Sequence, residues 1–80
     1  SVKALEPLRE VIAEVDEDLE MREHAVFALG QLEHADTMPM LLEIARNQDE
    51  PHLQRAAFFV LADHDTPEVR HLFEEILLTN

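Results

Sequence analysis

The chain has 80 residues, and its net charge of −12 argues against nucleic acid as a partner, because the phosphate backbone would repel it. Hydrophobic residues make up 46% of the chain, which is enough for a core and argues against disorder. The sequence lacks cysteine, a long apolar run and a recognisable signal peptide, so we expect a cytoplasmic protein without a membrane span.

Five stretches of the chain carry apolar residues three and four positions apart, the spacing that forms one face of a helix. The first stretch, for example, places Leu5, Leu8 and Ile12 on one face. No stretch shows the period-two alternation of a half-buried strand. We therefore predict five helices, at about residues 2–14, 19–32, 37–47, 50–62 and 67–78.

Short polar breaks separate these helices, so neighbouring helices should pack antiparallel. Asp49 is a good cap for the fourth helix, and Thr66 followed by Pro67 is a strong start for the fifth. Pro39 fits the first turn of the third helix, where its missing N–H costs nothing. Gly30 should allow two helices to approach closely.

The apolar pattern also predicts which side chains are buried. The centre of the fourth helix, residues 56–62, is apolar almost all round, so this helix should be the most buried. Met21 falls on a core-type position of the second helix. The four phenylalanines recur at related positions, and we interpret them as core residues rather than as the lining of a cofactor or peptide pocket.

The sequence repeats itself with a shift of 32 residues. Residues 21–29 align with residues 53–61, and residues 40–45 align with residues 72–77. Self-similarity at this period predicts a stacked helical solenoid, an all-α right-handed α–α superhelix. We expect a lone helix followed by two helix–turn–helix units, forming one domain over residues 1–80. Since solenoids rarely consist of two repeats, this domain should be a fragment of a longer chain.

Arg22, Ala25 and Leu29 in one helix, followed by Leu41 and Ile44 in the next, resemble the HEAT-like repeat. The short bacterial type, found in phycobilin-lyase-related proteins, is the most similar. The resemblance covers nearly the whole chain. It implies a scaffold that binds other proteins, by analogy of fold.

Residues 22–32 and 50–69 are also similar to the repeats of deoxyhypusine hydroxylase, which holds iron on His-Glu dipeptides. The matching positions here carry Glu23-His24, in reversed order, and Arg55-Ala56. Arginine and alanine cannot ligate iron. The resemblance therefore implies the fold of that enzyme without its activity.

The remaining candidate metal-binding and catalytic residues are interpreted as structural or solvent-exposed residues. No two histidines are four residues apart, the spacing with which one helix face binds a metal. We interpret Asp63-His64-Asp65 as a solvated polar turn rather than a loose metal site. Ser1 is the only serine and cysteine is absent, so a nucleophile is lacking. We expect no enzyme activity, no metal and no cofactor.

Two apolar residues of the third helix align with polar residues of the other repeats. Met38 aligns with Glu6 and Arg70, and Leu42 aligns with Glu10 and Glu74. A small apolar spot with a charged rim is typical of a protein-binding site. The alternative is contact with a part of the protein outside this segment. The predicted partner-binding residues are Glu10, Met38, Leu42, Arg46, Arg70, His71 and Glu74.

Three functions remain open at this point. The first is a non-enzymatic interaction module whose partner is a protein or peptide, with basic residues that match the acidic surface. The second is a structural or terminal segment of a larger array, in which Val11 and Val15 at one end, and Leu77 and Leu78 at the other, promote self-association. The third is an enzyme that depends on a metal or a pigment.

Overall fold

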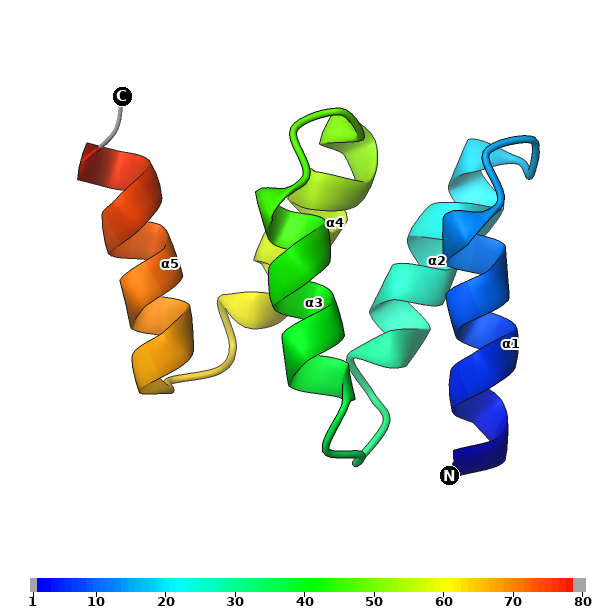
Figure 1. The fold of residues 1–80 in the computed structure, drawn as a ribbon, viewed down its shortest axis with the longest axis horizontal. Helices are drawn as coiled ribbons and strands as arrows, with labels where there is room; N and C mark the ends of the chain where they lie inside the picture. Colours follow the sequence, from blue (N-terminus) through cyan, green and yellow to red (C-terminus); the bar gives the residue numbers. More distant parts are fainter. Residues whose placement is uncertain (1, 79–80) are drawn as a thin grey trace.

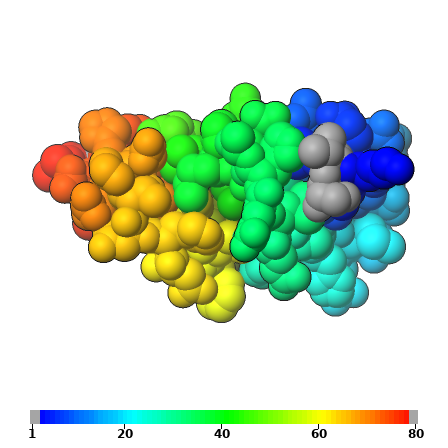
Figure 2. All heavy atoms as spheres, turned by 90° about the horizontal axis from the view of Figure 1, so that it is seen from below, coloured from blue at the N-terminus to red at the C-terminus, as the bar shows by residue number. Residues whose placement is uncertain are grey.

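The computed structural model describes residues 2–78, which form five α-helices and no strand. The helices are α1 (Val2–Ala13), α2 (Leu19–Leu29), α3 (Thr37–Arg46), α4 (Pro51–Leu61) and α5 (Pro67–Leu78). Helices α1, α3 and α5 lie side by side in one layer, and α2 and α4 form the second layer (Figures 1 and 2). The helices of one layer run in the same direction, opposite to those of the other (Figure 1). The predicted all-α fold is confirmed.

The closest packing joins the helices as two hairpins. α1 packs against α2, α3 packs against α4, and α2 and α4 lie against each other. The contact between α2 and α3 is slight, and α5 has no comparable close contact within the described residues. The expected grouping of a lone first helix and two following pairs is therefore wrong. The unpaired helix is α5, at the other end of the stack.

The core lies between the two layers. Its fully buried large side chains come from α2, α3, α4 and α5; they are Val26, Leu29, Leu41, Leu61 and Leu72. On α2 the buried residues are Arg22, Ala25, Val26 and Leu29, which follow the spacing of one helix face.

The burial prediction for Met21 is wrong, and so is the interpretation of all four phenylalanines as core residues. Met21 is 51% exposed, because it precedes the buried stripe of α2 and points about 100° away from it. α4 is not covered on all sides: Phe59 is 71% exposed and Phe27 also reaches the surface. These two rings contact each other edge to face on the outer side of α2 and α4, with 5.9 Å between the ring centroids. Only Phe58 and Phe73 pack against the core, as partly buried residues.

The helix ends follow local hydrogen bonding. α2 stops at Leu29, before the predicted end, because the amides of Gln31 and Leu32 turn to carbonyls three residues back rather than four. The predicted cap of α5 is confirmed, since the Val69 amide donates to Thr66 Oγ1 at 3.2 Å. The cap of α4 is Glu50 and not Asp49, and the carboxylate of Glu50 binds a side chain of α2 instead of the backbone.

Gly30 permits the close approach that its position predicts. A Cβ atom at residue 30 would lie 2.5 Å from Cγ1 of Val60 on α4. We expect Gly30→Ala to lower the free energy of unfolding by about 1 kcal/mol, because overpacking outweighs the loss of backbone freedom in the unfolded chain. In a Val60→Ala background the same substitution should be neutral or stabilising. Urea unfolding of the four proteins measures both effects, and equal effects in the two backgrounds would contradict the close approach.

A groove between the first and third helices

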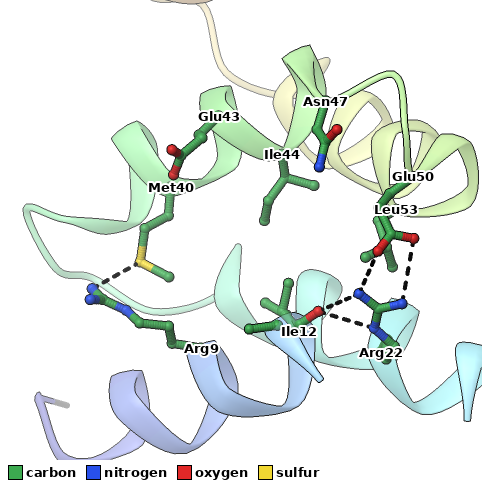
Figure 3. A pocket seen from close by; sticks show the side chains of 10 residues that line it. Arg9, Ile12, Arg22, Met40, Glu43, Ile44, Asn47, Glu50 and Leu53 are labelled. Atoms are coloured by element: carbon green, nitrogen blue, oxygen red, sulfur yellow. Dashed lines mark hydrogen bonds and ion pairs between the residues drawn. The ribbon is translucent and has the colours of Figure 1, made fainter. Parts of the chain in front are cut away.

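An open groove of about 620 Å³ separates α1 from α3, and α2 and α4 close it at the back (Figure 3). The lining combines apolar residues with charged and amide side chains. These residues are Arg9, Ile12, Ala13, Arg22, Met40, Glu43, Ile44, Asn47, Glu50 and Leu53. We call this cavity the α1–α3 groove.

The floor of the groove is apolar. Ile12 comes from α1, Ile44 from α3 and Leu53 from α4. Ile12 and Leu53 belong to the buried core, and Ile44 packs against it, so the floor is continuous with the hydrophobic interior. Such a floor can accept an apolar side chain of a ligand without exposing new polar groups.

Arg22 closes the inner end of the groove. Its side chain is buried, and Nε and Nη2 donate to the carbonyl oxygen of Ile12 at 3.0 and 2.7 Å. The same guanidinium donates to Glu50, with an Nη2–Oε2 distance of 2.9 Å (Figure 3). The planar donor set of arginine is suited to binding a carbonyl and a carboxylate together. Arg22 therefore ties the end of α1 to the start of α4.

The second repeat contains a simpler version of this contact. Gln54 is the equivalent of Arg22 under the 32-residue shift, and its Nε2 donates to the carbonyl of Ala45 at 2.9 Å. In both hairpins, then, a side chain of the second helix satisfies a carbonyl near the end of the first helix, which would otherwise lack a partner.

The rim of the groove is polar. Arg9 on α1 reaches across to α3, where its Nη2 lies 3.5 Å from the sulfur of Met40. Arg9 also lies 3.7 Å from Glu6, and both side chains remain accessible to solvent. Glu43 and Asn47 are exposed on the α3 side. An apolar floor with polar groups at its edge suits a peptide side chain better than a reaction.

Six of the seven predicted partner-binding residues lie on α3 and α5. Leu42 and Arg46 line a shallow second depression, the α3 hollow, together with Pro39, Met40 and Glu43. Met38 and Leu42 are partly buried and pack against the core, so neither is the freely exposed anchor that the repeat alignment indicates.

Arg46, His71 and Arg70 of this set lie beside carboxylates that do not belong to it. Nε of Arg46 lies 3.5 Å from Glu75, and Nε2 of His71 lies 3.6 Å from the same carboxylate. Arg70 pairs with Asp65 in the preceding loop. Glu74 is exposed on α5, whereas Glu10 is exposed on α1 and lines neither the groove nor the hollow.

Sequence reasoning missed the α1–α3 groove and the role of Arg22. A signal for Arg22 exists, since it shares the spacing of Ala25 and Leu29 and is thus a charged residue on an apolar face. No comparable signal marks the groove, because its width depends on the separation of α1 and α3. Within residues 2–78, no three His, Asp or Glu side chains are grouped closely enough to hold a metal ion.

Two layers of parallel helices, related by a 32-residue shift, define an α-helical repeat protein. Residues 5–80 match the family of HEAT repeats, so the chain belongs to this family. HEAT repeats generally serve as scaffolds for protein interactions. No characterised protein and no solved structure is significantly similar to the chain. None of the helices in residues 2–78 has the length and apolar character that crossing a bilayer requires.

Proposed function

We propose that the chain is a non-enzymatic interaction module that binds a segment of another protein on the face formed by α1, α3 and α5. The observation that carries this proposal is the α1–α3 groove, with its apolar floor and polar rim. The α3 hollow adjoins it, because Met40 and Glu43 line both cavities. The binding face thus extends from Arg9 on α1 across α3 toward His71 and Glu74 on α5.

The negative charge of the chain favours a partner with basic residues. The net charge of the chain is −12, and the exposed carboxylate of Glu43 lies between the groove and the hollow. A partner segment with a large apolar residue flanked by lysine or arginine would match the apolar floor and the carboxylate of Glu43 together. In this arrangement Ile44 in the groove contacts the apolar residue, Leu42 in the α3 hollow contacts a neighbouring part of the segment, and Glu43 contacts a basic residue.

Binding rather than catalysis suits the polar groups of the groove. Arg22, its most deeply buried charge, is already engaged by Ile12 and Glu50. Every buried side-chain nitrogen and oxygen in residues 2–78 has a hydrogen-bond partner. The buried groups therefore hold the fold together, and the exposed groups are those available to a ligand. We place this function in a single domain over residues 1–80.

Selection of 12-residue peptides displayed on phage tests this proposal. The immobilised chain should enrich peptides with a large apolar residue flanked by lysine or arginine, and these should shift the amide NMR signals of α1 and α3. Leu42→Glu should weaken binding at least about tenfold. It should not reduce the helical content, since glutamate occupies both equivalent positions, Glu10 and Glu74. Glu43→Lys should weaken it similarly.

The matched control is Glu33→Lys, which makes the same charge change in the loop between α2 and α3. It should leave binding within about twofold of the parent, because rim-distant charges act only through screened, long-range forces. Peptides that shift only α2 and α4, or that bind the Leu42→Glu and Glu43→Lys proteins as tightly as the parent, would overturn the proposal.

A further inference from the structure

The outer end of the α1–α3 groove is formed by one side chain from each helix. Nη2 of Arg9 on α1 lies 3.5 Å from the sulfur of Met40 on α3, and this contact spans the groove at the end opposite Arg22 (Figure 3). Ile12 and Ile44 lie between the two ends (Figure 3). The groove therefore has an apolar centre, which a guanidinium and a thioether border at its outer end.

This outer end differs from the equivalent place between α3 and α5. The 32-residue shift places Leu41 at the position of Arg9. It places Leu72 at the position of Met40. Both leucines are buried, so on α3 and α5 these two positions belong to the core. On α1 and α3 the same positions carry a cation and a polarisable sulfur, and they line an open cavity instead.

The contacts of Arg9 leave its guanidinium available to a ligand. A thioether sulfur is a weak hydrogen-bond acceptor, so the contact with Met40 is easily exchanged. The ion pair of Arg9 with Glu6 is 3.7 Å long, with side chains that are 48% and 64% exposed, and such pairs contribute little stability. Because the N–H donors of a guanidinium lie in its plane, neither contact occupies its faces, which can stack on an aromatic ring.

We propose that the anchor residue of the partner segment is aromatic, and that Arg9 and Met40 select it. This inference rests on the proposed function of the groove. The ring lies on Ile12 and Ile44, the guanidinium of Arg9 covers its face, and the sulfur of Met40 meets its edge. Both selecting contacts depend on the π electrons of the ring, which an aliphatic side chain lacks. On the α3 side, Glu43 contacts a flanking lysine or arginine.

Other anchor residues suit the outer end less well. An acidic anchor would pair with Arg9, but the carboxylates of Glu6 and Glu43 lie at the same rim and the chain has a net charge of −12. An aliphatic anchor would fill the apolar centre, but it would remove water from the guanidinium of Arg9 without replacing the lost interaction. An aromatic ring fills the same centre and replaces that interaction by a cation–π contact.

Two 12-residue peptides that differ only in their central residue test the proposal. This residue is phenylalanine in one peptide and cyclohexylalanine in the other, with two lysines on each side and serine and glycine at the ends. Cyclohexylalanine is similar in size and more apolar, so by apolar burial alone it would bind at least as tightly. In NMR titrations of the whole chain, both peptides should shift signals of α1 and α3. The phenylalanine peptide should bind at least about threefold more tightly.

A protein with both Arg9→Gln and Met40→Leu should lose this preference. The two substitutions keep side chains of similar length and volume while removing the cation and the sulfur. Arg46→Gln is the matched control, because it removes the same charge from the α3 hollow, outside the groove. It should strengthen the binding of both basic peptides and leave the ratio of their affinities unchanged.

The outcomes separate this inference from the proposed function. Equal or tighter binding of the cyclohexylalanine peptide by the parent protein would overturn the aromatic anchor while the groove remained a binding site. So would a preference that persists in the double variant, or one that Arg46→Gln also removes. If neither peptide bound, the proposed function of the groove would itself fail, and the aromatic anchor with it.

Discussion

Replacing Arg22 by alanine is expected to lower the free energy of unfolding by about 3 kcal/mol, because it leaves the Ile12 carbonyl and the Glu50 carboxylate without their buried donor. The loss should appear in urea unfolding and as a fall in Tm of roughly 12–24 °C for a domain of this size. Glu50 is partly accessible to solvent, which keeps the estimate at the low end of the range for buried ion pairs.

The matched variant is Arg22→Gln, which copies the residue found at the equivalent position of the second repeat, Gln54. Glutamine can still donate to the Ile12 carbonyl, as Gln54 does to Ala45, but it cannot pair with Glu50 as a charge. We expect it to lose about half as much stability as Arg22→Ala. A loss below about 1 kcal/mol for Arg22→Ala would mean that Arg22 does not join the two hairpins as described.

Replacing Leu72 by alanine is expected to release α5 while the two hairpins remain folded. Leu72 is fully buried, and α5 packs less closely on the stack than the other helices. Truncating a buried leucine costs about 2–5 kcal/mol of stability. This loss should exceed the free energy that holds α5, which packs on one side only, against the two hairpins. Circular dichroism should show the loss of the 12 helical residues of α5, and NMR should show their signals in random-coil positions.

Leu77→Ala provides the comparison on the same helix. Its side chain is largely exposed, and alanine has the higher helix propensity, so helical content should stay the same or rise slightly. If Leu72→Ala unfolded all five helices together, the chain would be one cooperative unit. The description of α5 as the least firmly held helix would then be incorrect.

Several features of the fold follow from local sequence rules. The positions of Pro39, Thr66 and Gly30 indicate two helix starts and one close approach, because each residue acts through its own backbone or its nearest neighbours. The 32-residue shift identifies the repeat architecture before any contact is known. These predictions depend on few residues, and the structure confirms them.

Other features depend on how the layers meet, and the sequence pattern does not define them. An apolar pattern that covers most of a helix, as on α4, does not say which side lacks a neighbour, and Phe59 lies on that side. The pairing of Arg22 with Glu50 joins residues 28 positions apart, and no spacing rule indicates it. The α1–α3 groove arises from the distance between two helices. The site residues predicted on α3 and α5 remain proposals.

Amide hydrogen exchange of the unmodified chain tests most directly the claim that, within residues 2–78, two hairpins are followed by a helix without a second-layer neighbour. Amides in α2 and α4, which lie against each other and against the first layer, should exchange most slowly. Those of α5 should exchange at least about tenfold faster, since local opening requires less free energy where fewer contacts are lost. Equal protection of all five helices would contradict the account.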